Sequence, residues 1–239
     1  MMIRSCLVTL GMLAVAGPPS AILAQDRPEV PRAGDSTAKA PAGSKIVVEI
    51  DTSDIPEAAE WAEQAKGVVE AWYPKVATIL QSDGDSPPPK LKLVFKKRLR
   101  VPAYAGGRTI TISGPWIREH PDDLGMVVHE LTHLIQHYPR SEDDHGWLIE
   151  GIADYVRFFH YEPGEAIGPF DPEGASYRDS YRTSARFLAW IEKTHDKTIV
   201  ATLNRACQEG KYKPVLFQEA TGRTLDELWD EFVKASRPR

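Results

Sequence analysis

Residues 125–138, GMVVHELTHLIQHY, combine a helical pattern with a cluster of side chains that can bind a metal ion. Their apolar residues recur at the spacing of a buried helix: Met126, Val127, Leu131, Leu134 and Ile135. His129 and His133 are four residues apart. On a helix their imidazoles therefore share one face and can converge on a single ion. The stretch predicts a buried helix that carries a metal site.

Residues 129–133 have the form H-E-x-x-H, which is typical of zinc hydrolases. In such enzymes two neutral imidazoles hold Zn²⁺ and a carboxylate accepts a proton from the attacking water. Glu130 lies about 100° around the helix from His129, so it can reach that water without being a ligand. The alternative is a surface helix that carries these residues by chance, and the motif alone does not exclude it.

A catalytic zinc has three protein ligands, so the chain must supply one besides the two histidines. Metzincins place a third histidine six residues after the second, and Pro139 at that position excludes this class. Residues 146–157, GWLIEGIADYVR, predict a second helix with Glu150 and Asp154 on one face. This resembles thermolysin-like (gluzincin) enzymes, in which a Glu is the third ligand and an acid one turn later hydrogen-bonds a ligand histidine. We therefore expect Glu150 to bind the metal and Asp154 to orient a histidine.

Two alternatives to Glu150 and Asp154 stay open at this point. His145 also lies between the two predicted helices and is the rival third ligand. Residues 146–157 could instead form a solvated helix with two ordinary acids, although several apolar residues argue against that exposure: Leu148, Ile149, Ile152, Ala153 and Val156. His137 continues the histidine spacing by one turn and is expected at the rim of the site.

Three segments together are similar to the basic secretory protein family, the predicted zinc peptidases of plants and bacteria. They are HELTHLIQ at 129–136, WLIEGIADYVR at 147–157 and YRTSARFL at 181–188. The resemblance extends from about Lys45 to the C-terminus. It implies a zincin fold, a gluzincin-type site with one Zn²⁺ per chain, and a peptide or protein substrate. The net charge of −5 departs from the word "basic" in the family name.

Length and composition are those of an ordinary soluble globular protein. The 239 residues suffice for one substantial catalytic domain or two small ones, and 42% of them are hydrophobic and 26% charged. The negative net charge gives no reason to expect nucleic acid or an anionic membrane as a partner. The oligomeric state is left open by the sequence.

Residues 1–24 have the pattern of a signal peptide. Arg4 supplies the positive start, residues 6–17 the apolar core, and Ala24 a plausible end of the cleavage site. A membrane anchor is the alternative, but glycines and prolines interrupt a run that is already too short to span. We expect a secreted or periplasmic protein with no integral membrane segment after cleavage.

Residues 25–44 are rich in Pro, Ala and Gly without a hydrophobic period, which predicts a flexible linker. The zincin-like metallopeptidase domain is then expected over residues 45–239. Cys207 would be the one cysteine left after cleavage, and its apolar helical surroundings predict a buried residue.

Early strands and late helices predict an α+β, zincin-like fold. It would have a small N-terminal mixed sheet with an edge strand over the cleft, an active-site helix and a mostly helical C-terminal part. Strands are expected at 45–51, 91–97 and 108–113. Besides the two metal helices, further helices are expected at 55–80, with a bend or break at Pro74, and at 179–193, 198–208, 214–220 and 224–235. Thr224 and Glu227 form a capping-box pattern, and residues 159–173 are expected to be a loop.

In zincins the strand before the metal helix is often the sheet edge and can bind the substrate backbone by strand addition. By this analogy residues 108–113 are predicted to be that edge, with Thr109 and Thr111 in contact with substrate. The alternative is an ordinary amphipathic strand. Trp147 is expected to line the cleft, although an aromatic residue near a helix start often packs in the core.

Amide hydrolysis also needs a hydrogen-bond donor for the oxyanion that develops on the carbonyl. Tyr181 is the candidate because it opens the third family-like segment, and Tyr177 and Tyr155 are its rivals.

The sequence thus predicts a secreted zinc metallopeptidase in which Glu130 accepts a proton from water and delivers it to the leaving amine. One alternative is a zinc amidase that acts on non-protein, cell-wall amides. Another is a zinc-binding protein without turnover, although a structural zinc does not require Glu130 and more often fills its fourth position with Cys or His.

Overall fold

The computed structural model describes residues 46–81, 90–139, 145–163, 167–179 and 181–237. The chain divides into two compact units, residues 1–32 and 33–239, and every described residue belongs to the second. The predicted signal peptide and linker, residues 1–44, lie outside the described residues. Within the described part of the chain, no helix combines the length and the apolar character that crossing a membrane requires.

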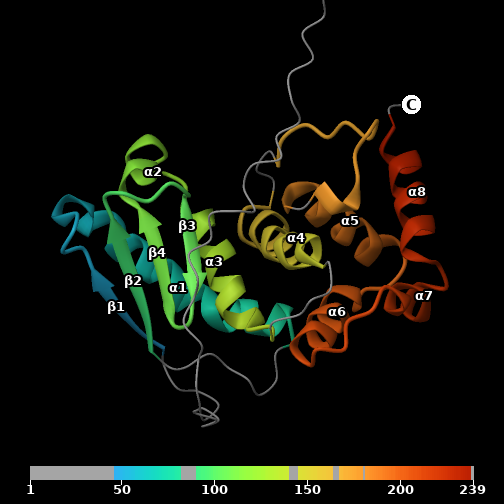
Figure 1. The fold of residues 1–239 in the computed structure, drawn as a ribbon, viewed down its shortest axis with the longest axis horizontal. Coiled ribbons are helices and arrows are strands. Elements are labelled where there is room, and N and C mark those ends of the chain that lie inside the picture. The colour runs from blue at the N-terminus through green and yellow to red at the C-terminus, as the bar shows by residue number, and fades with distance from the viewer. Residues whose placement is uncertain (1–45, 82–89, 140–144, 164–166, 180, 238–239) are drawn as a thin grey trace, which may run out of the picture. The chain divides into compact units, whose positions relative to one another are not determined.

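A four-stranded mixed sheet, in the order β1-β2-β4-β3, carries the first part of the fold (Figure 1). β1 (Val47–Asp51), β2 (Lys90–Lys96) and β4 (Thr109–Ser113) run parallel, and β3 (Ala103–Gly106) is antiparallel to β4. The predicted alternation along β2 is confirmed. Leu91, Leu93 and Phe95 are buried, whereas Lys92 and Lys96 lie on the other face, which we call the outer face.

The edges of the described sheet are β1 and β3, so the prediction that residues 108–113 form the sheet edge is wrong. β4 is internal because it pairs with β2 on one side and with β3 on the other. Thr109 and Thr111 therefore lie on an internal strand, where Thr111 is buried. β3 has only four residues, AYAG, and lacks a run of β-branched residues that would have revealed it in the sequence.

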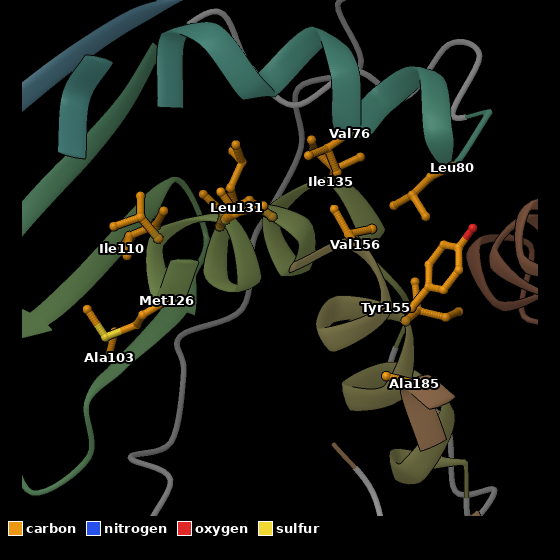
Figure 2. Close-up of a cluster of buried hydrophobic side chains, with 14 of the residues drawn as sticks. Val76, Leu80, Ala103, Ile110, Met126, Leu131, Ile135, Tyr155, Val156 and Ala185 are labelled. Carbon is orange, nitrogen blue, oxygen red and sulfur yellow. The ribbon is translucent and has the colours of Figure 1, made fainter. Parts of the chain in front are cut away.

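The metal helix α3 (Gly125–Gln136) is almost fully buried because it packs between the sheet and two other helices, α1 (Ala59–Ile79) and α4 (Gly146–Val156). Figure 2 shows Met126 of α3 beside Ala103 of β3, and Ile135 beside Val76 of α1. A short 3₁₀ turn (Pro56–Ala58) precedes α1, and the predicted break at Pro74 does not occur because α1 continues through it. The sheet and α1 thus fix the position of the metal helix.

The remaining described elements are mostly helical, as predicted. They are α2 (Gly114–Glu119), a π-helical turn (Arg157–Tyr161), a 3₁₀ turn (Tyr177–Asp179), α5 (Tyr181–Thr194), α6 (Ile199–Gln208), α7 (Val215–Thr221) and α8 (Leu225–Ser236). The α+β class and the capping box at Thr224 are confirmed. The π-helical turn extends into the expected loop at 159–173.

Gly151 allows α4 and α5 to approach closely. A Cβ atom at this position would come within 2.5 Å of the Ser184 Cβ, so a larger residue would push the helices apart. Glu150 directly precedes Gly151, so this contact also fixes the position of the predicted third ligand along α4 relative to α5.

The predicted burial of Cys207 is confirmed, because the side chain is 2% exposed and burial raises the pKa of its thiol to about 12. Since the thiolate is the reactive form, we expect iodoacetamide at pH 8 to leave Cys207 unmodified in the folded protein. The same reagent should modify it after denaturation in urea. Mass spectrometry of the peptide that contains Cys207 measures both, and equal rates in the two states would contradict the buried position.

Candidate metal centre

Three side chains from α3 and α4 converge on one point. His129 Nε2 and His133 Nε2 are 3.0 Å apart, and Glu150 Oε2 lies 3.3 Å from each of them. Within the described residues this trio is the group of His, Cys, Asp or Glu side chains that could hold a metal ion. The site is formed by the periodicity of α3, which places the two histidines on one face, and by the packing of α4 beside it.

Asp154 holds the first histidine in place. His129 Nδ1 donates a hydrogen bond to Asp154 Oδ1 at 2.7 Å, and the Asp154 side chain is buried. This bond directs Nε2 of the ring towards His133 and Glu150. Asp154 is one helical turn beyond Glu150, so α4 supplies both a possible ligand and the residue that orients another one.

Gln136 holds the second histidine in place, a role that was not predicted from the sequence. His133 Nδ1 donates to Gln136 Oε1 at 2.7 Å, while Gln136 Nε2 donates to the carbonyl of Ile149 at 3.0 Å. The buried amide therefore joins one possible ligand on α3 to the backbone that precedes Glu150 on α4. Its position three residues after His133 was the signal that could have found it.

The electrostatics of the trio are those of a site for a cation. Burial opposes protonation of His129, but hydrogen bonds to Asp154 and Glu150 and the charge of Glu130 outweigh it and raise its pKa to about 10. Burial also opposes ionisation of Glu150, but the two histidines hold the pKa of its carboxyl far below the usual range. With both Nδ1 atoms donating elsewhere, the inward Nε2 and Oε2 atoms need a shared proton or a metal ion between them. The residues present therefore fit a bound metal.

Glu130 is buried beside the trio but is not part of it. Glu130 directly follows His129 on α3, so it lies about 100° around the helix from that residue. Its charge contributes to the raised pKa of His129. The carboxylate is thus close to the possible ligands without being one. This is the placement that a base acting next to a metal requires.

Tyr181 reaches the site from the start of α5. Its ring stacks near that of His129, with 6.3 Å between centroids and 20° between planes, and it is 47% exposed. The backbone at Tyr181 has a φ of 49°, a left-handed conformation that is uncommon for a residue with a side chain. The rivals point elsewhere, because the Tyr155 hydroxyl donates to Glu192 at 2.7 Å and the Tyr177 hydroxyl to Asp226 at 3.3 Å.

Two other candidates lie outside the trio. His145 is buried against Tyr212, with ring centroids 5.3 Å apart, so Glu150 rather than His145 completes the group. Trp147 is 4% exposed and packs against Tyr177 and Phe217, with centroids at 4.9 and 6.3 Å. Its side chain belongs to an aromatic cluster that joins α4 to the C-terminal helices. The role of Trp147 at the wall of the cleft stays a prediction.

The comparisons with known proteins agree with this arrangement. The family model BSP, described as peptidase of plants and bacteria, matches residues 39–232. The chain belongs to this family. All three residues of the possible metal site lie within the range that matches the BSP family. A search of curated proteins found no match.

Replacing Gln136 with alanine is expected to weaken metal binding by about 10–100-fold, the usual loss when a partner of a ligand histidine is removed. Gln208→Ala is the matched control, because Gln208 also donates to a backbone carbonyl of α3, that of Ile135 at 3.2 Å, while its side-chain oxygen accepts from Asn204 at 3.3 Å. Competition with a chromogenic chelator measures both affinities. Equal weakening in the two variants would mean that Gln136 acts only through the backbone of the BSP domain.

Proposed function

We propose that the protein is a secreted zinc-dependent metallopeptidase that hydrolyses peptide bonds with Glu130 as general base. The observation that carries the proposal is the convergence of His129, His133 and Glu150 within 3.3 Å, with Glu130 beside them. Membership of a peptidase family supports peptide bonds as the target. Export rests on the signal-peptide pattern of residues 1–24.

The donor set favours zinc over other metals. Two imidazoles and one carboxylate are a known ligand set of catalytic zinc, whereas magnesium and calcium prefer oxygen ligands alone. Zinc–ligand bonds of about 2.0–2.1 Å at tetrahedral angles separate neighbouring ligand atoms by about 3.3 Å. The observed separations of 3.0, 3.3 and 3.3 Å are close to this value. A zinc ion held here would polarise the scissile carbonyl and lower the pKa of a water molecule towards about 7.

Side chains of the protein would carry out proton transfer, orient the ligands and bind the substrate. Glu130 accepts the proton that the attacking water loses and hands it to the leaving amine. Asp154 and Gln136 keep the two imidazoles oriented, through hydrogen bonds of 2.7 Å to each ring. The edge strand β3, which packs against α3, offers its free backbone groups to an extended substrate. Contact of Thr109 and Thr111 with substrate stays a prediction, now from an internal strand.

Tyr181 is the proposed donor to the oxyanion, because its ring lies over His129 and its rivals are bonded elsewhere. Removing one such donor costs roughly 10²–10³ in kcat. We expect Tyr181→Phe to lower kcat by this factor while the KM changes little and the metal content stays the same. Tyr177→Phe is the control and should keep kcat within a few-fold. A Tyr181→Phe enzyme with normal kcat would exclude this role.

The proposal is tested by incubating the purified protein with a mixed peptide library and identifying the products by mass spectrometry. Cleavage should stop when a chelator removes the metal and return when zinc is added back. Cleavage that persists in the chelator would contradict a metal-dependent mechanism. No cleavage of any peptide by zinc-loaded protein would contradict the peptidase assignment and favour amides of another kind, which a cell-wall amidase assay would then detect.

A further inference from the structure

A block of positive charge lies in a chain whose net charge is −5. Residues 90–108, which run from β2 to the start of β4, contain four lysines and three arginines and no acid. A local excess of cations attracts an anionic group.

Part of this charge is neutralised by the neighbouring strand. Lys90 and Lys92 on β2 pair with Glu49 and Asp51 on β1, at 2.8 and 2.7 Å. The bond from Lys92, together with those from Ser53, lowers the pKa of Asp51 well below its usual range. β1 ends at Asp51, opposite Val94, so β2 continues two residues beyond its last partner on that side.

Three of the remaining cations lie at and just after the end of β2. Lys96, Lys97 and Arg98 are exposed, and among the described residues no salt bridge to any of them is found. They line a hollow of about 460 Å³ with Leu99, Tyr104, Thr111 and Asp54. The Asp54 carboxylate already accepts a hydrogen bond from the Lys97 backbone at 2.8 Å, so the acid in the hollow serves to hold the loop.

The loop that presents these cations is held in place. Ser113 donates from its backbone to the carbonyl of Pro102 at 2.9 Å and from its hydroxyl to that of Leu99 at 3.1 Å. With the bond to Asp54, three hydrogen bonds fix the segment after β2. The hollow is therefore a defined feature of the outer face of the sheet, with hydroxyls from Tyr104 and Thr111 among its walls.

The hollow adjoins the edge strand on which we place the substrate. Val94, Thr111 and Tyr104 are direct cross-strand partners on β2, β4 and β3, so they form one row on the outer face. A peptide strand paired with β3 would extend this row beside Tyr104, about 4.8 Å further on. The side chain of that peptide residue would lie on the outer face beside Tyr104, which lines the hollow together with Lys96, Lys97 and Arg98.

We propose that this hollow is a subsite for a carboxylate side chain of the peptide substrate. The substrate class is then extended peptides with Asp or Glu at the position that pairs with Tyr104. Alternation along a strand places every second side chain on the same face, so only positions of one parity can use the subsite. The inference rests on the proposed function, because it takes β3 as the strand that binds the substrate backbone.

Matched peptides that differ only by Glu or Gln at one position test the subsite, with that position moved along the sequence. Their dissociation constants are measured by fluorescence anisotropy on the Glu130→Gln protein, which should bind without turnover. Exposed pairs with two or three cations should favour Glu by roughly 5–30-fold at low salt, at one position or at positions two apart. The preference should fall as salt is added.

The Lys96→Gln/Arg98→Gln double variant should bring the Glu-to-Gln ratio close to one. Lys90→Gln/Lys92→Gln is the matched control, because it removes the same charge from the part of β2 that pairs with β1 and should leave the ratio intact. Equal binding of both peptides, or a preference that survives the first double variant, would overturn the subsite. So would binding of inorganic phosphate in the hollow without any Glu preference, since that indicates a site for free anions.

Cleavage by the unmodified enzyme separates this inference from the proposed function. If the Glu preference also appears in kcat/KM, the proposed function and the subsite are both supported. If no peptide is cleaved but the preference in binding depends on Lys96 and Arg98, the proposed function fails and the subsite stands. If peptides are cleaved with no preference at any position, the subsite fails alone.

Discussion

Glu130→Gln is expected to lower peptide hydrolysis by about 10²–10⁴-fold while the protein still binds its metal. Glutamine keeps the size and polarity of the buried side chain but cannot accept the proton that water must lose. Glu130 is outside the trio His129, His133 and Glu150, so the ligands are unchanged. The measurement is kcat/KM on a cleavable peptide together with metal content by atomic emission after dialysis.

Glu150→Gln is the control that separates the two functions of an acid at this site. Glu150 belongs to the trio, so its replacement should lose metal and activity together, whereas Glu130→Gln should lose activity alone. A Glu130→Gln protein with activity within a few-fold of normal would exclude Glu130 as the base. Loss of metal in that variant would mean instead that Glu130 helps to hold the ion.

The parts of the site that lie on one helix could be predicted from the sequence, because helical periodicity alone places them. His129 and His133 are four residues apart on α3, and Glu150 and Asp154 are four apart on α4. The recognition that α4 packs beside α3 came from the family-like order of the two segments. The structure confirms that packing and the hydrogen bond between Asp154 and His129.

The features that the sequence did not reveal depend on how neighbouring helices and strands pack against one another. Gln136 acts as a bridge only because Ile149 of α4 presents a carbonyl to it. The packing of Trp147 on α4 against Tyr177 and Phe217 likewise depends on how the C-terminal helices lie. β3 was missed because a four-residue strand has too little pattern, and its pairing with β4 made the predicted edge an internal strand.

Removal of the metal is expected to destabilise the fold, by an amount that grows with pH. A ligand at roughly 1,000 times its dissociation constant stabilises the folded state by about 4 kcal/mol. For a domain of this size, that corresponds to a Tm lower by about 10 °C after treatment with a chelator. Since α3 and α4 each contribute to the trio, the metal ties together two helices at the centre of the fold.

The pH dependence follows from the proton that replaces the metal. In the metal-free fold the pKa of His129 is about 10, against 6.5 for an ordinary histidine, because its bonds to Asp154 and Glu150 outweigh burial. The stability that this proton provides is fully present below about pH 6.5 and is lost as the pH rises through about 10. Metal binding must displace the proton, so metal affinity rises over the same range. These are two expressions of one exchange of a proton for a metal, and it widens the difference in Tm between the two forms as the pH increases.

Differential scanning calorimetry from pH 6 to pH 9.5, with zinc or with a chelator, measures this difference. Glu150→Gln should show little response to the chelator at any pH, because one of the three ligands is gone. A difference in Tm that narrows as the pH rises would contradict the exchange of a proton for a metal at His129. Equal Tm values in zinc and chelator at every pH would mean that the trio contributes to the fold through its own hydrogen bonds, and that the ion is needed for the reaction alone.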